Sequence, residues 1–204
     1  MRIALYGGTG MIGSRIALEA LSRDHHVTTI SRNLSSDVPI GAKARTGNAG
    51  DADDVARVAA EHDVVVSAIG PSRTGARAQI FLHALACLAE NVGTRRLVVV
   101  GHAGSLEVAP GLRLLDSPGF PAAYLAEALT HTAALELLKD TGAIVDWVYV
   151  SPAPGIGPGE RTGIYRMGID MPVGDWITAE DYAVAIVDEI EVARFHRVRF
   201  NVAH

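Results

Sequence analysis

Apolar runs and amphipathic segments alternate along the first 150 residues. Runs such as Val64-Val-Val66 and Leu97-Val-Val-Val100 are rich in β-branched residues, which is typical of strands covered on both faces. The pattern predicts strands over 2–6, 26–30, 42–46, 63–67, 96–100 and 146–150. Segments with the helical period lie between these strands and predict helices over 11–22, 53–61, 77–91 and 122–140. This alternation predicts an α/β fold with a doubly wound parallel sheet flanked by helices.

The pattern loosens after Ser151. Three prolines and four glycines between positions 152 and 163 predict a loop. A short strand over 163–167, a helix from the N-cap Thr178 through about Glu191, and a last strand over 197–202 follow. We interpret residues 151–204 as a small C-terminal lobe that serves the substrate side of a single domain spanning 1–204.

Composition narrows the class of protein. Of the 204 residues, 49% are apolar and 20% are charged, which is ordinary for a globular domain. The net charge is −5 and no basic run occurs, so we expect no nucleic-acid partner. No apolar run is long enough to span a membrane, and no signal peptide is recognisable. The single cysteine, Cys87, excludes an intrachain disulfide framework. We therefore expect a cytoplasmic protein without membrane partners.

A glycine turn directly follows the first predicted strand. The sequence Gly7-Gly-Thr9-Gly10-Met11-Ile12-Gly13 opens the first predicted helix. In this pattern the first glycine permits a tight strand exit, the second lets the backbone approach a pyrophosphate, and the third lets the helix pack closely. The helix N-terminus offers free N–H groups to phosphates. The alternative is a glycine turn without a ligand. We favour a Rossmann-type dinucleotide site.

Arg32 indicates which dinucleotide binds. An NAD site usually carries an acidic residue about 20 positions after the glycine turn, where this chain has Ser31-Arg32-Asn33. A guanidinium is suited to the 2′-phosphate of NADP. The sequence therefore favours NADP(H) over NAD(H), with Arg45 as a second candidate charge. The alternative is that Arg32 is a solvated surface residue.

The ends of the later strands supply further candidates, because ligands of parallel sheets lie beyond the carboxyl ends of the strands. Asp51 follows the third strand, and it either accepts a hydrogen bond from the adenine amino group or caps the next helix. The remaining expected cofactor contacts are Ala68, Ile69 and Gly70 after the fourth strand, Gly101 after the fifth, and Ser151 and Pro152 after the sixth.

Taken together, these residues resemble the atypical branch of the NAD(P)-binding short-chain dehydrogenase/reductase superfamily. The resemblance is to NmrA-like and flavin/biliverdin-reductase-B-like proteins, and it spans nearly the whole chain. The segments that carry it are the glycine turn, Gly47-x-x-Gly-Asp51, Val65-Val-Ser-Ala-Ile-Gly70, Gly104-Ser-Leu-Glu-Val-Ala-Pro-Gly111 and Ile177-Thr-Ala-Glu-Asp-Tyr-Ala183. The resemblance implies an NAD(P)H-binding oxidoreductase, although the scaffold also serves proteins without catalysis.

The chain departs from the superfamily in its chemistry. Typical members use a Tyr-x-x-x-Lys pair as proton donor. No tyrosine here has a lysine four positions later, and only Lys43 and Lys139 occur. Reduction of a ketone by that mechanism is therefore not expected. A flavin or quinone acceptor fits better, because its reduced anion is delocalised and solvent can supply the proton.

The candidate catalytic groups are Ser105, His131 and Tyr124, with His102 a further polar candidate. The resemblance places His131 near a histidine of flavin-reductase-like members. Each of these residues could instead have a structural role. The histidines show no metal-ligand spacing, so we expect no metal site.

Two hypotheses follow. The first is an NADPH-dependent reductase that passes a hydride to a small planar acceptor. The second is a non-catalytic NADP(H) sensor, like the NmrA-like regulators, because the absence of the Tyr/Lys pair suits it equally well. The compact chain without an appended partner domain favours the reductase.

Overall fold

The computed structural model describes residues 1–33, 37–71 and 78–204. Within these residues an eight-stranded sheet has the order β10-β12-β8-β5-β4-β1-β2-β3. Its strands run parallel except β10, which pairs antiparallel with β12. The strands are β1 (Arg2–Tyr6), β2 (His26–Ser31), β3 (Lys43–Thr46), β4 (Val64–Ser67), β5 (Arg96–Val100), β8 (Trp147–Pro152), β10 (Arg166–Ile169) and β12 (Val198–Ala203).

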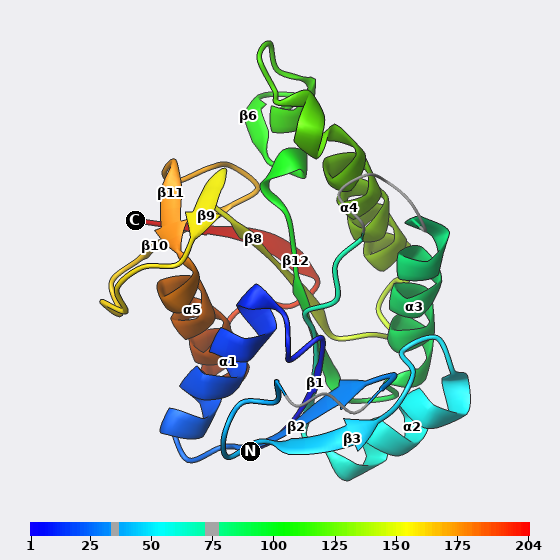
Figure 1. Ribbon diagram of the computed structural model, residues 1–204. Coiled ribbons are helices and arrows are strands. Elements are labelled where there is room, and N and C mark those ends of the chain that lie inside the picture. Colours follow the sequence, from blue (N-terminus) through cyan, green and yellow to red (C-terminus); the bar gives the residue numbers. More distant parts are fainter. Residues whose placement is uncertain (34–36, 72–77) are drawn as a thin grey trace.

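Helices cover both faces of the sheet (Figure 1). One face carries α1 (Met11–Ser22) and α5 (Ala179–Val192), which pack against each other. The other carries α2 (Ala52–Glu61), α3 (Ala78–Asn91) and α4 (Ala122–Asp140). The helices on both faces of the mostly parallel sheet confirm the predicted doubly wound α/β fold.

The core is divided by the period of two along each strand. In β1, Ile3 and Leu5 join the buried cluster that contains residues of α1 and α5. Ala4 and Tyr6 join the cluster that contains residues of α2, α3 and α4. Each central strand therefore buries both of its faces, which explains its continuous apolar sequence.

The strand order reverses at β1, which pairs with β2 on one side and with β4 on the other. The chain continues from β1 to β2 and β3 in one direction, and from β4 to β5, β8 and β12 in the other. Such a switch point leaves a crevice beyond the carboxyl ends of the strands, because the connections leave it in opposite directions.

Most predicted boundaries agree with the structure to within one or two residues. The start of the predicted helix 77–91 lies outside the described residues. The short strand expected over 163–167 is shifted, because β10 begins at Arg166. Several small elements were not predicted: η1 (Ala103–Ser105), β6 (Glu107–Ala109), β7 (Leu112–Arg113), η2 (Leu114–Asp116), β9 (Gly155–Gly157) and β11 (Trp176–Thr178).

The C-terminal segment is built into the sheet. Strand β12 lies beside β8, and β10 forms the outer edge, while β9 and β11 make a separate parallel pair. The N-cap expected at Thr178 is confirmed, since its hydroxyl accepts from the Asp181 backbone N–H at 3.0 Å. Among the described residues, no helix is long and apolar enough to cross a membrane.

Candidate functional site

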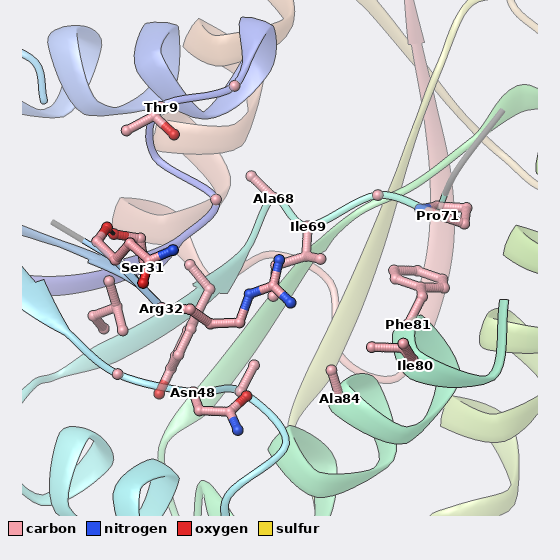
Figure 2. Close-up of a pocket in the computed structure, with 18 residues that line it drawn as sticks. Thr9, Ser31, Arg32, Asn48, Ala68, Ile69, Pro71, Ile80, Phe81 and Ala84 are labelled. Carbon is pink, nitrogen blue, oxygen red and sulfur yellow. Dashed lines mark hydrogen bonds between the residues drawn. The ribbon is translucent and has the colours of Figure 1, made fainter. Parts of the chain in front are cut away.

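A cavity of about 570 Å³ lies beyond the carboxyl ends of β1, β2 and β4, at the switch point of the sheet. The glycine turn, the end of β2 and the end of β4 meet around it (Figure 2). Its lining includes Gly7, Thr9, Gly10, Arg32, Asn48, Ala68, Ile69, Gly70 and, from α3, Phe81.

The glycine turn is tightly folded against its neighbours. Gly7 has a φ of +81°, and a Cβ there would lie 2.6 Å from the Ala68 carbonyl oxygen. A Cβ on Gly13 would lie 2.1 Å from the Gly7 carbonyl oxygen. Both contacts are with backbone, so neither position accepts a side chain. The glycines expected to allow a tight exit and close helix packing do so.

The N-terminus of α1 is not neutralised by its own residues. Its N-cap Gly10 has no side chain to offer, and the first turn contains no acidic residue. In contrast, α2 and α5 each have a capping side chain and two acidic residues in the first turn. The first N–H groups of α1 and the positive end of its dipole are therefore suited to an external anion, such as a pyrophosphate.

Arg32 is exposed and lines the cavity, and Figure 2 shows its guanidinium extended into the space between Ile69 and Asn48. Among the described residues, no carboxylate pairs with it. Arg45 does not supply the second charge suggested by the sequence. Its guanidinium pairs with Glu61 at 3.0 Å and with Asp54 at 3.5 Å, and it does not line the cavity.

The residues present fit a dinucleotide, since a glycine cradle that a Cβ would fill, an uncapped helix N-terminus and an exposed guanidinium surround one cavity. Met11, Ile12 and Gly13 form the first turn of α1 behind this lining. Three other expected cofactor contacts, Gly101, Ser151 and Pro152, do not line the cavity and belong to the ends of β5 and β8.

Asp51 has the capping role. Its carboxylate accepts from the Asp54 backbone N–H at 3.0 Å, and it does not line the cavity. Asn48, which sequence reasoning missed, does line it. The Asn48 side-chain oxygen accepts from the Gly50 N–H at 3.1 Å, so its NH₂ group is left to donate. Its position immediately after Gly47, at the end of a strand, was the available signal.

The ends of β5 and β8 carry a second group of polar residues. A Cβ on Gly101 would lie 2.2 Å from the Tyr149 ring, so this strand end rests directly on Tyr149. The Tyr149 hydroxyl accepts from the His102 backbone N–H at 3.2 Å and lies 3.2 Å from His131 Nδ1. Ser151 donates to the His102 carbonyl at 3.1 Å. Together these contacts join β5, β8 and α4.

The two histidine rings stack with centroids 5.4 Å apart. Burial lowers the pKa of His102 to about 4 and that of His131 to about 3, because an imidazolium is poorly solvated there. Both rings are therefore neutral at pH 7. Burial also raises the pKa of Tyr149 well above its ordinary value. At neutral pH neither imidazole carries an imidazolium proton to transfer, and the Tyr149 phenol is a weaker acid than an ordinary tyrosine.

Among the described residues, the other two catalytic candidates make no side-chain hydrogen bond to this group. Ser105 is buried, and Arg199 donates both to its backbone carbonyl and, at 3.1 Å, to its hydroxyl oxygen. Arg199 in turn pairs with Asp170 at 2.6 Å. Tyr124 is 46% exposed on the first turn of α4. Neither residue lines the cavity, which favours the structural alternative for Ser105.

Over residues 1–33, 37–71 and 78–204, no cluster of His, Cys, Asp and Glu could hold a metal ion.

The chain is similar to several known proteins. The family described as NAD(P)H-binding matches residues 7–192. The protein YwnB of Bacillus subtilis (strain 168) is 38% identical, with 99% of this chain and 98% of YwnB covered. A Burkholderia pseudomallei structure described as a "putative exported protein" is 45% identical, with a TM-score of 0.88 and both chains fully covered.

A structure from Streptococcus pneumoniae TIGR4, described as a "putative NADH-flavin reductase", is 27% identical with a TM-score of 0.89. The alignment covers 100% of this chain and 99% of that one. The family match includes the glycine turn, Arg32 and every other described residue that lines the cavity except Tyr6. The chain therefore belongs to the NAD(P)H-binding family, as its glycine turn predicted.

Proposed function

We propose that the protein is an NADPH-dependent reductase that passes a hydride to a small planar acceptor such as a flavin or a quinone. The observation that carries the proposal is the meeting of the glycine turn, the uncapped N-terminus of α1 and Arg32 at one cavity. The name of the Streptococcus relative, which refers to NADH and a flavin, supports the reductase class and the flavin acceptor, and the preference for NADPH rests on Arg32.

The residues have distinct tasks in this proposal. The backbone N–H groups at the start of α1 bind the pyrophosphate, and Arg32 binds the 2′-phosphate, whose charge matches its guanidinium. Asn48 donates its free amide hydrogens to the nucleoside. The small side chain of Ala68 and the bare backbone of Gly70 let the cofactor approach β4. When bound, the reduced nicotinamide supplies a hydride.

The protonation states favour an acceptor that takes its proton from water. His102 and His131 are neutral, and Ser105 is held by Arg199. A ketone would need a proton donor as its alkoxide forms, whereas a reduced flavin or quinone is a delocalised anion that solvent protonates. We also propose a cytoplasmic location, in line with the single free thiol of Cys87.

Turnover tests the proposal directly. We expect NADPH absorbance at 340 nm to fall when riboflavin or menadione is added to the protein, and Gly10→Ala to remove most of this activity while the protein stays folded. If NADPH binds tightly but neither acceptor oxidises it, the reductase proposal is wrong and the protein acts as an NADP(H) sensor.

A further inference from the structure

Hydrogen bonds fix both the backbone and the ring of His102. It lies two residues after the end of β5, and both of its backbone groups are bonded: the N–H to the Tyr149 hydroxyl at 3.2 Å and the carbonyl to the Ser151 hydroxyl at 3.1 Å. Its ring is bonded as well, since Nδ1 accepts from the Gly104 N–H at 2.9 Å. The ring also stacks on His131. These contacts fix the position and the plane of the imidazole.

The same contacts fix the tautomer. Because Nδ1 accepts a hydrogen bond, the neutral ring carries its hydrogen on Nε2. Within the described part of the chain, Nε2 has no hydrogen-bond partner. Solvent reaches this atom, because it is not one of the buried polar atoms that lack a partner. His102 therefore presents one oriented N–H donor to which no described residue offers an acceptor.

His102 is linked to the cofactor cavity through neighbouring rings and strands. His131, on which the His102 ring stacks, also contacts the edge of Phe81, with ring centroids 5.2 Å apart. Phe81 lines the cavity. Strand β5, which leads to His102, pairs with β4, whose end supplies Ala68 and Gly70 to the cavity. His102 thus follows the next strand along the sheet edge from the cofactor lining.

We propose that His102 is the acceptor-binding residue, and that its Nε2–H donates to a carbonyl oxygen of a planar conjugated acceptor, a flavin or a quinone. This inference rests on the proposed reductase function and specifies its substrate class. It excludes acceptors without a conjugated carbonyl from full activity.

The chemistry explains why such a donor is useful. The acceptor gains a hydride with its electron pair, and the negative charge that results is delocalised onto the carbonyl oxygen. A hydrogen bond to this oxygen strengthens as the charge develops. The proton that completes the reduction comes from water, so the ring remains neutral throughout. The sum is NADPH, acceptor and one proton giving NADP⁺ and the two-electron-reduced acceptor.

Two variants separate the donor from the structural role of the ring. In His102→Asn the side-chain oxygen can replace Nδ1 as the acceptor for Gly104, but the Nε2 donor is lost. In His102→Gln an NH₂ group can reach the Nε2 position, but the bond from Gly104 is lost. Both variants are checked for an unchanged melting temperature and unchanged NADPH affinity, so that loss of folding or of the cofactor is recognised.

The first readout is equilibrium binding to the protein saturated with NADP⁺, which cannot reduce the ligand. Riboflavin is followed by its fluorescence, and menadione by competition with riboflavin. We expect His102→Asn to weaken binding on the order of three- to tenfold, the usual effect of losing one neutral hydrogen bond. His102→Gln should weaken it less. If His102→Asn loses affinity for only one of the two ligands, the hydrogen bond is made to that ligand, and the result shows whether the site recognises a flavin or a quinone.

The second readout is kinetic. His102→Asn should lower kcat/KM for menadione by at least tenfold and leave that for methylene blue, a planar dye without a carbonyl, unchanged. Equal losses for both acceptors, or none for either, would overturn the assignment. In the wild-type protein the ¹⁵N resonance of His102 Nε2 should shift when riboflavin binds. No shift despite binding would also overturn it, without relying on a variant.

Failure of the function and failure of the inference give different results. If wild-type protein binds NADPH but neither binds nor reduces riboflavin or menadione, the reductase function is wrong and the inference falls with it. If wild-type protein reduces both acceptors and His102→Asn does so equally well, the function stands and only the role of His102 is wrong.

Discussion

Gly10 and Gly13 lie three residues apart in the same turn, yet they serve different purposes. A Cβ on Gly13 would overlap the backbone of Gly7 and Gly8. Among the described residues, a Cβ on Gly10 would meet only the Gly7 carbonyl oxygen, at 3.4 Å. The backbone of Gly10, with a φ of −77° and a ψ of 170°, also suits other residues. Gly13 is therefore needed by the fold, and Gly10 by the ligand.

Alanine substitutions at Gly10 and Gly13 should therefore have different effects on NADPH binding and on stability. Gly10→Ala should change the free energy of unfolding by no more than about 1 kcal/mol and weaken NADPH binding at least tenfold, because the methyl group occupies space beside the phosphate. Gly13→Ala should lower stability by about 1–3 kcal/mol, because the backbone must shift. Urea unfolding and calorimetry measure both. Wild-type affinity in folded Gly10→Ala would contradict a pyrophosphate at this turn.

At this scale the sequence predicted the residues whose role depends on backbone and spacing. The glycines and Arg32 follow from their distance to the first strand, and Gly7, Gly10 and Arg32 line one cavity in the structure. Asn48 was missed although its position after Gly47 was a signal. The His102–His131–Tyr149 contacts could not be predicted, because they join the ends of β5 and β8 to α4, which are distant in sequence. Arg45 was misjudged because its partners Asp54 and Glu61 come from α2.

Among the elements, α2 illustrates how a cap and a ligand contact are distinguished. Asp51 ends the connection from β3 and begins the helix, and its bond to the Asp54 N–H satisfies one of the free donors of the first turn. A capping side chain followed by acidic residues marks the start of a helix in the sequence. Both α2 and α5 have this pattern, and for this reason their starts were predicted closely. The small strands β6, β7, β9 and β11 have two or three residues each and no comparable signal.

We expect Asp51→Ala to lower the free energy of unfolding by about 1 kcal/mol, the usual value of an N-cap. NADPH affinity should stay within twofold of wild type, since the carboxylate does not line the cavity. Asp51→Asn, which keeps an oxygen in place, should retain most of the stability. A tenfold loss of NADPH affinity in Asp51→Ala would show instead that the carboxylate contacts the adenine.

For the whole molecule, the buried histidines make stability depend on pH. The pKa of His131 is about 3 in the folded protein, against an ordinary value of 6.5. Below pH 6.5 the unfolded chain therefore binds a proton that the folded protein refuses, and stability falls as the pH falls. Between pH 7 and pH 5 His131 alone should cost about 2 kcal/mol. His102 acts in the same direction.

Urea unfolding at the two pH values measures this effect. The decrease should be smaller by about 2 kcal/mol in His131→Gln, which has no ionisable ring. The control His26→Gln, at an exposed position, should show the full decrease of the wild type. Equal decreases in all three proteins would mean that the pKa of His131 is not lowered in the folded state.

The central claim is that the cavity at the switch point binds NADPH through Arg32, and calorimetry tests it most directly. NADPH should bind wild-type protein at least tenfold more tightly than NADH, a difference of about 1.4 kcal/mol or more. Arg32→Ala should abolish this preference, and Arg45→Ala, whose guanidinium is already paired, should retain it. A preference that survives in Arg32→Ala, or no binding of either nucleotide to the wild type, would contradict the account.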